Sequence, residues 1–245
     1  YKDSRIKVIR NVENIGIARS VNKGLDIAKG EYIARMDSDD ISLPDRIQKQ
    51  VECLESHREV GLCCTNISII DLKGNVVNKS YWAPGEVPIE WAMCWENPIA
   101  QSTVMMRKST LNQNNLRYKI IFAEDFEFWS RIALKSRIIR LNEVFVSYRL
   151  HEDSRYHKNK EIYDKQAHNS QIEFVKTISG INPPDFYKDL TVFAAISKGE
   201  NAKKDYCAAI LDWYLILRRA ITIWFKYNYL EEDQIIKDIC IRYSN

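Results

Sequence analysis

Short apolar runs alternate with amphipathic stretches along the chain up to about Ser154, a pattern that predicts a mixed α/β domain. Strands are predicted at Arg5–Arg10, Glu31–Met36, Val60–Ile70 and Ser102–Arg107, with one or two strands in Ile138–Leu150. Helical spacing predicts helices over Gly16–Ala28, from about Ser42 to His57, and over Asp125–Lys135. A turn is expected at Lys73–Asn75 and a loop at Trp82–Gly85. Because short connections join the first strand, helix and strand, we expect a parallel sheet there.

The pattern changes after Ser154. The rest of the chain has helical spacing, with breaks at Asn182–Pro184 and Lys198–Gly199. One long helix is predicted by an apolar stripe that consists of Tyr206, Ile210, Trp213, Leu217, Ile221 and Trp224. We therefore expect an α/β domain at 1–155 and a C-terminal helical region at 156–245. The helical stripe is expected to pack on the domain or to form a homodimer, with peripheral contact to a membrane as the alternative.

The composition is that of a globular protein, with 45% hydrophobic and 28% charged residues. The net charge of +3, without a basic block that carries aromatic residues, argues against a nucleic-acid partner. The six cysteines lack the spacing of a zinc site, which favours reduced thiols and a cytoplasmic setting. Apolar runs are far shorter than the roughly 20 residues that a membrane span needs. The chain opens on Tyr1 rather than Met, so we expect sequence to be missing upstream.

Three carboxylates, those of Asp37, Asp39 and Asp40, stand directly after the second predicted strand, in the sequence ARMDSDD. Carboxylates this close repel one another, so a folded chain keeps them mainly where something positive lies among them. Open α/β sheets bind ligands at the carboxyl ends of their strands, and hard oxygen ligands suit Mg²⁺ or Mn²⁺. The alternative is a solvated acidic turn in which Asp40 or Ser42 caps the next helix.

The stretch around this turn, NIGIARSVNKGLDIAKGEYIARMDSDDISLPDRIQKQVECL, resembles the bacterial family 2 glycosyltransferases. The family's Asp-x-Asp-Asp, its preceding A-x-G-E-Y-I and its following P-D-R match Asp37–Asp40, Ala28–Ile33 and Pro44–Arg46. The resemblance implies the GT-A fold, a Rossmann-like mixed sheet flanked by helices.

The resemblance also assigns roles to residues of this stretch. Asp37 and Asp39 would contact the donor ribose and a Mg²⁺ or Mn²⁺ ion on the nucleotide diphosphate, with Asp40 beside them in the metal site. Asn14, Gly16 and Asn22 would lie near the nucleotide. Roles in a helix cap and a turn are the alternative for these last three residues.

Adjacent carboxylates also occur in FAEDFEFWSRIA, at a predicted helix start where the helix dipole favours the ionised form. An acidic first turn is common, so these residues alone favour a structural role. In the resembled family a Glu-Asp pair at this place supplies the catalytic base, which makes Asp125 the general base and Glu124 a residue that positions a sugar. Trp129 is expected in the core.

Two further segments resemble parts of the family. In SYRLHEDSR, the residues Arg149, His151 and Ser154 match a loop that closes over the diphosphate, where arginine binds phosphate and histidine completes a metal shell. A surface histidine is the alternative for His151. In NPIAQSTVMMRKS, Gln101 stands where the family often has a histidine, and it can still form a hydrogen bond with a hydroxyl.

The resemblance implies an inverting, metal-dependent glycosyltransferase of bacterial surface polysaccharide synthesis. The donor would be a nucleotide sugar, with a UDP-sugar favoured, and the acceptor a glycan or a lipid-linked sugar. The enzyme would lie in the cytoplasm or at the inner face of the cell membrane. Members of the family open with a strand, a helix and a strand that ends in Asp-Asp-Gly-Ser, which this chain lacks, so we expect an N-terminally truncated catalytic domain. The alternatives are an inactive remnant that serves as a binding or assembly module, and a nucleotide-sugar hydrolase.

Overall fold

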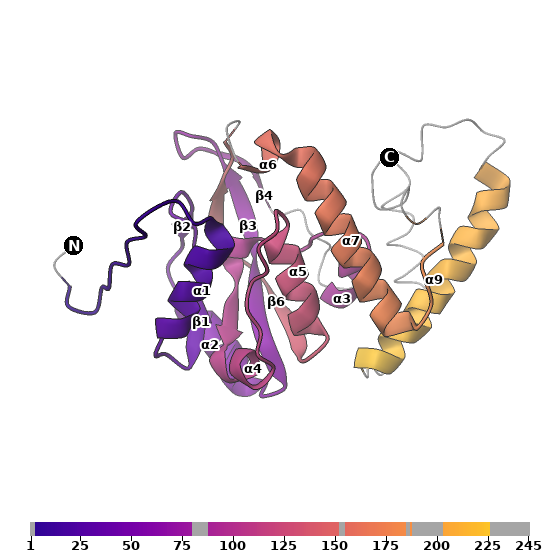
Figure 1. Ribbon diagram of the computed structural model, residues 1–245, viewed down its shortest axis with the longest axis horizontal. Coiled ribbons are helices and arrows are strands. Elements are labelled where there is room, and N and C mark those ends of the chain that lie inside the picture. Colours follow the sequence, from indigo (N-terminus) through magenta and orange to yellow (C-terminus); the bar gives the residue numbers. More distant parts are fainter. Residues whose placement is uncertain (1–2, 80–87, 152–154, 185–186, 188–202, 226–245) are drawn as a thin grey trace.

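A mixed sheet lies at the centre of the computed structural model, which describes residues 3–79, 88–151, 155–184, 187 and 203–225 (Figure 1). Its six strands are β1 (Tyr32–Ala34), β2 (Ile41–Ser42), β3 (Val60–Ile70), β4 (Val76–Lys79), β5 (Met105–Arg107) and β6 (Arg137–Arg149). Their order is β1-β5-β3-β6-β2, with β4 beside β3. The pair β3 and β6 is parallel and the other pairs are antiparallel. The expected mixed α/β fold is confirmed.

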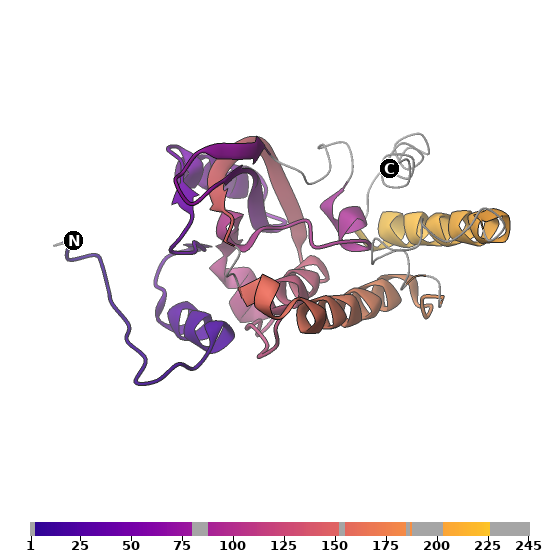
Figure 2. The ribbon, with the colours of Figure 1, turned by 90° about the horizontal axis from the view of Figure 1, so that it is seen from above.

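Helices surround this sheet and extend to one side of it. They are α1 (Ile17–Ile27), α2 (Arg46–Ser56), α3 (Ile89–Met93), α4 (Lys108–Gln113), α5 (Glu124–Ala133), α6 (Arg155–Lys158), α7 (Lys160–Ser179) and α9 (Lys203–Phe225), with a 3₁₀ helix, η1 (Gln101–Thr103). Helix α7 packs on α5, and α9 packs on α7 and α3. The views of Figures 1 and 2 show α7 and α9 beyond α5, away from the sheet. The predicted helices near 16–28, 42–57 and 125–135 are thus confirmed as α1, α2 and α5.

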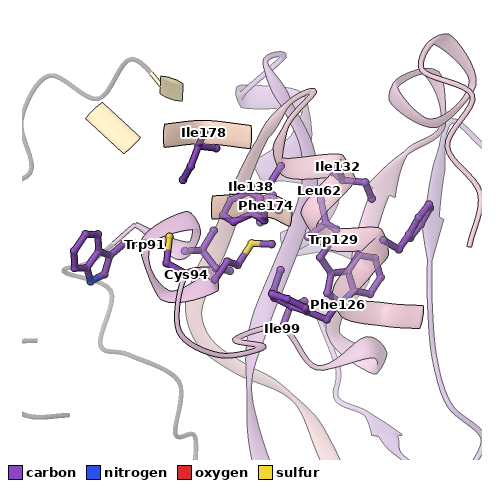
Figure 3. Close-up of a cluster of buried hydrophobic side chains, with 14 of the residues drawn as sticks. Leu62, Trp91, Cys94, Ile99, Phe126, Trp129, Ile132, Ile138, Phe174 and Ile178 are labelled. Atoms are coloured by element: carbon purple, nitrogen blue, oxygen red, sulfur yellow. The ribbon is translucent and has the colours of Figure 1, made fainter. Parts of the chain in front are cut away.

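One hydrophobic cluster joins the sheet to these helices (Figure 3). Leu62 of β3 and Ile138 of β6 face Trp129 of α5, and all three are buried. Phe174 and Ile178 of α7 continue the same cluster. The burial of Trp129 in the core, expected from the sequence, is confirmed because its side chain has no exposed surface.

Helix α9 belongs to this cluster through a stripe close to the predicted one. Trp213, Leu217 and Ile221 are buried, and Tyr214 stacks on Trp95 with ring centroids 4.5 Å apart. Trp224 was expected in the stripe, but 42% of it is exposed, because Phe225 takes the buried position at the end of the helix. The packing of the helix on the domain is confirmed, whereas the domain boundary at 155 stays a prediction.

Two expectations about the start of the chain are wrong for the described residues. No strand forms at Arg5–Arg10, where Ile6, Val8 and Ile9 are exposed. A β-strand is held by backbone hydrogen bonds to a neighbouring strand. No described strand forms such hydrogen bonds with this segment. Strand β1 pairs with β5 in antiparallel fashion, so the parallel neighbour expected for it is absent from that described sheet. The loop expected at Trp82–Gly85 lies outside the described residues.

The described helices differ in length and in apolar character. Helix α9, the longest at 23 residues, carries several charged side chains among its apolar ones. None of the helices within the described ranges combines the length and the apolar character that crossing a bilayer requires.

Two leucines of α9 provide a test of its packing. Replacing the buried Leu217 with alanine removes apolar contacts from the cluster, and we expect the free energy of unfolding to fall by about 2–5 kcal/mol. Leu215→Ala on the exposed face of the same helix is the matched control and should change it by less than about 0.5 kcal/mol. Urea unfolding followed by tryptophan fluorescence measures both. Equal effects would show that α9 does not pack on the domain in solution.

Candidate functional site

The three clustered carboxylates lie on the connector between β1 and β2, which stand at opposite ends of the strand order. This connector, Arg35–Asp40, is called the acidic turn below. It starts at the carboxyl end of β1, level with the beginning of β5 and with Cys63 of β3, and it leads to β2, which pairs with Val146 and Ser147 near the carboxyl end of β6. Ligands of open α/β sheets bind at the carboxyl ends of strands. The position expected for the acidic turn from the sequence is therefore confirmed.

A buried arginine holds the backbone of the acidic turn. Arg46, in the first turn of α2, donates from Nη2 to the carbonyl oxygens of Arg35 (2.9 Å) and Val104 (3.3 Å). Its Nε donates to Oε1 of Gln50 (3.0 Å), and Gln50 donates in turn to the carbonyls of Cys63 and Thr103. Burial lowers the pKa of Arg46 to about 10, so the guanidinium remains charged at neutral pH. This network fixes the turn to β3 and η1.

Each carboxylate of the acidic turn has a donor or cation beside it. Asp37 accepts from Arg35 Nη2 at 2.6 Å and from Ser102 Oγ at 3.1 Å. Asp40 accepts from the backbone amide of Arg149 at 2.8 Å, and burial raises the pKa of its carboxyl group. Oδ2 of Asp39 lies 3.0 Å from Nε2 of His151. The positive charge that the sequence demanded is thus supplied in part by the protein itself.

The capping alternative for this cluster is not supported. Helix α2 begins after Asp45, which has a left-handed backbone (φ 64°) and makes no side-chain capping hydrogen bond. Ser42 lies in β2, and the carboxylate of Asp40 bonds to β6 instead of to the amides of α2. The acidic turn is therefore not explained as a helix cap.

The residues of the expected closing loop divide into three cases. The guanidinium of Arg149 donates to the carbonyl oxygens of Asp39 (2.8 Å), Asp71 (2.8 Å) and Leu72 (3.2 Å), so it holds two turns together here. His151 reaches the acidic turn as expected. Ser154 lies outside the described residues.

The donor set at Asp39 and His151 suits a divalent cation. The Nε2 atom of His151 is buried without a partner of hydrogen-bond geometry, although the Asp39 oxygen is 3.0 Å away. Two such converging atoms fit two ligands of one ion. Within the described part of the chain, no group of three or more ligating side chains is arranged to hold a metal. Mg²⁺ commonly takes only one or two carboxylates and completes its shell with water and substrate phosphate, so an incomplete protein shell fits this use.

A pocket of about 430 Å³ opens beside the acidic turn and is lined by Asn14, Gly16, Ile17, Ser20, Val21 and Arg35. Asn14 accepts a hydrogen bond from the amide of Gly16 (3.0 Å), whose backbone is left-handed (φ 80°) at the start of α1. These two residues thus line a pocket and also shape the helix start. Asn22 does not line this pocket, because its amide bonds to the backbone of Tyr118 on both sides (2.8 and 2.9 Å).

The expected base, Asp125, lies in the first turn of α5 beside the buried Glu124. Its Oδ1 accepts from the amide of Phe126 (2.7 Å) and from the hydroxyl of Tyr163 on α7 (3.1 Å). Its Oδ2 accepts from Nδ2 of Asn97 (3.0 Å). Burial raises the pKa of Asp125 above the ordinary aspartate value, while these donors oppose the shift.

Several site residues were not found from the sequence. Arg35 and Asn97 lie inside sequence stretches that were singled out for other residues. A search of these stretches for polar side chains could have found both. Tyr163 offers no local signal, because a tyrosine on a helix is common and its contact with Asp125 joins elements 38 residues apart. Gln101 lies near the acidic turn, with its Oε1 3.4 Å from Nη2 of Arg35.

Comparison with known proteins gives the class. Residues 1–108 match the family model described as Glycosyl transferase family 2. An uncharacterized glycosyltransferase of Haemophilus influenzae is 34% identical over 159 residues, which cover 61% of this chain and 49% of that protein. The Escherichia coli enzyme WfaP, named as a UDP-Glc:alpha-D-GlcNAc-diphosphoundecaprenol beta-1,3-glucosyltransferase, is 34% identical over 154 residues, which cover 62% of this chain and 59% of that protein.

One solved structure supports the fold. The crystal structure of S. aureus TarS 1–349 in complex with UDP-GlcNAc matches with a TM-score of 0.51 at 17% identity, over 84% of this chain and 61% of that one. Sheet, flanking helices and acidic turn therefore define a domain of the GT-A type. Residues 1–108 match the family 2 glycosyltransferases, and the curated relatives are named as glycosyltransferases. The chain spans about half the length of the curated relatives it matches.

The buried Arg46 gives a prediction about the acidic turn. Arg46→Met keeps much of the volume but removes the donors to Gln50 and to the carbonyl of Arg35, so we expect the free energy of unfolding to fall by about 3 kcal/mol. Lys49→Met, an exposed cation on the same helix, is the control and should change it by less than about 0.5 kcal/mol. Urea titration decides, and equal stability of the two variants would contradict the described network.

Proposed function

We propose that this chain carries the catalytic centre of an inverting, metal-dependent glycosyltransferase that uses a nucleotide sugar as donor. The observation that carries the proposal is one short segment that bonds to both expected parts of the site. Asn97 at its start binds Asp125, and Ser102 near its end binds Asp37. In a glycosyltransferase the base and the diphosphate must lie on either side of the transferred sugar. A segment that bonds to Asp125 at one end and to Asp37 at the other holds these two parts of the site close to each other.

The base is the carboxylate of Asp125. The acceptor hydroxyl gives its proton to Asp125 while its oxygen attacks the anomeric carbon of the donor sugar. The bond between that carbon and the diphosphate oxygen breaks, and the electron pair leaves with the diphosphate. A single displacement inverts the configuration at the anomeric carbon. Burial raises the pKa of Asp125 and thereby makes the carboxylate a stronger base than an exposed aspartate.

The acidic turn is proposed to hold the diphosphate. Asp39 and His151, with Asp37 and Asp40 close by, are the residues that would bind Mg²⁺ or Mn²⁺. Such an ion neutralises negative charge on the leaving diphosphate. Arg35 lines the pocket and adds a positive charge next to Asp37. Asn14 and Gly16 are proposed to contact the nucleotide in this pocket, and Asn22 to support it through Tyr118.

The names of the relatives support the choice of substrates in this proposal. WfaP is named for a UDP-Glc donor and a diphosphoundecaprenol acceptor, and WbnJ of Escherichia coli for O-antigen biosynthesis. We therefore favour a UDP-sugar donor, a glycan or lipid-linked acceptor, and a role in bacterial surface polysaccharide synthesis in the cytoplasm. Exposed Leu215, Ile223 and Trp224 on α9 support contact with the membrane surface where a lipid-linked acceptor lies, and a homodimer through this face is the alternative.

The metal site is tested by nucleotide binding. Asp39→Asn keeps the shape of the side chain but removes its charge, so we expect UDP binding in the presence of Mn²⁺ to weaken by about tenfold or more. Calorimetric titration with Mn²⁺ or with EDTA measures the effect. Asp45→Asn, which makes the same charge change at the start of α2, should bind as the unchanged chain does. Equal affinity of the unchanged chain with Mn²⁺ and with EDTA would refute metal dependence.

The base is tested by separating chemistry from binding. Asp125→Asn cannot accept the proton, so we expect kcat to fall by about 10²–10⁴-fold while UDP binding stays within about threefold. Transfer to a panel of acceptors, followed by mass spectrometry, measures the rate. Asp164→Asn on α7, an exposed carboxylate that pairs with Lys160, is the control. Full activity of Asp125→Asn would remove this residue from the chemistry.

A further inference from the structure

The carboxylate of Asp125 is held by two side chains that come from outside its own helix. Tyr163 Oη, on α7, lies 3.1 Å from Oδ1, and Nδ2 of Asn97 lies 3.0 Å from Oδ2. The amide of Ile99 donates to Oδ1 of Asn97 (3.3 Å), which fixes the amide orientation of Asn97 with its donor toward Asp125. Nδ2 of Asn97 also lies 3.3 Å from Tyr163 Oη, so the three side chains form a closed triangle.

The two oxygens of Asp125 are not equivalent in this triangle. Oδ1 accepts from both the amide of Phe126 and the hydroxyl of Tyr163, which fills its ordinary capacity of two donors. Oδ2 accepts only from Asn97 among the described residues and keeps a lone pair for a further proton.

We propose that Tyr163 and Asn97 are positioning residues that keep Asp125 ionised and leave Oδ2 as the oxygen that receives the acceptor's proton. The inference rests on the proposed function of Asp125 as general base. It assigns a role in positioning the base to Tyr163 of α7. Both residues act through Asp125, with no contact to substrate required of them.

The surroundings of Asp125 make these donors necessary. Glu124 precedes it on α5, and Tyr118 and, from β6, Tyr148 interact electrostatically with it. The donors to the Asp125 carboxylate in the described structure are the amide of Phe126, the hydroxyl of Tyr163 and the side-chain amide of Asn97. Burial, with a further contribution from the charge of Asp125, raises the pKa of Tyr163 well above its ordinary value. The phenol therefore keeps its proton and its hydrogen bond throughout the working pH range.

The pH profile of the reaction tests the proposal. Tyr163→Phe removes a donor to the ionised form, so the pKa of Asp125 rises and the acid limb of kcat/KM moves to higher pH by about one unit. Below that limb the rate falls by about tenfold relative to the unchanged chain, and above it the two rates converge. Asn97→Leu should move the limb in the same direction, and Asn97→Asp further, because a second carboxylate adds repulsion.

Tyr156→Phe is the matched control. Tyr156 is exposed, and its ring centroid lies 5.1 Å from that of Tyr163. The donors to Asp125 are Phe126, Tyr163 and Asn97, so removal of the Tyr156 hydroxyl should leave the limb in place. A fall in rate that is equal at every pH for Tyr163→Phe and Asn97→Leu would overturn the proposal, because a merely structural defect behaves in this way.

A direct titration separates this inference from the proposed function. The carboxyl carbon of Asp125 can be followed by ¹³C NMR in aspartate-labelled chain, with Asp125→Asn assigning the signal. We expect its midpoint to rise by about one pH unit in Tyr163→Phe and to stay unchanged in Tyr156→Phe. An unchanged midpoint in Tyr163→Phe refutes the inference, whatever the activity. If the midpoint shifts in Tyr163→Phe but Asp125→Asn is fully active, the hydrogen bond between Tyr163 and Asp125 is supported. The proposed role of Asp125 as the base is then refuted.

Discussion

The structure depends on balancing like charges in the acidic turn. Asp37, Asp39 and Asp40 lie where one strand ends, and their mutual repulsion grows as they leave water. A different group lies beside each: Arg35 of the turn itself beside Asp37, His151 after β6 beside Asp39, and the backbone amide of Arg149 bonded to Asp40. The turn can therefore keep its shape only when the end of β6 is in place, which couples the sheet to the site.

Arginines serve this site in two ways, and the difference matters for function. Arg149 donates to main-chain carbonyls, and Arg46 donates both to the carbonyl of Arg35 and to the side chain of Gln50, so the two arginines clamp the backbone of the turn. Arg35 instead binds the carboxylate of Asp37 and faces the pocket. A guanidinium carries five N–H donors in a fixed plane and can hold a loop in this manner without using up the loop's carboxylates. The oxygens of Asp39 thus stay available to a ligand, with its side chain 45% exposed.

Sequence patterns predicted the parts of the fold that local periodicity determines. Helices α1, α2 and α5 and strand β3 follow from repeats within a few turns of chain, and Asp37, Asp39 and Asp125 follow from motifs. Pairing does not follow in this way, because the partner of β1 is set by residues far along the chain. For the same reason the roles of Arg149 and Asn22 as backbone clamps were missed. Both residues have side chains that suit a ligand, and only the folded contacts show that backbone groups occupy them.

Helix α7 is joined to the α/β domain by the buried cluster and by a hydrogen bond to Asp125. A change of pattern near residue 155 separates strands from helices in the sequence, yet the buried cluster runs from Trp129 of α5 to Phe174 and Ile178 of α7. A carboxylate at the start of α5 needs donors that lie at fixed distances, and a loosely attached helix could not supply one. The apolar contacts of α7 therefore have a chemical consequence, since they hold the hydroxyl of Tyr163 at Asp125. Core packing and the hydrogen bonding of Asp125, the proposed base, therefore depend on the same helix.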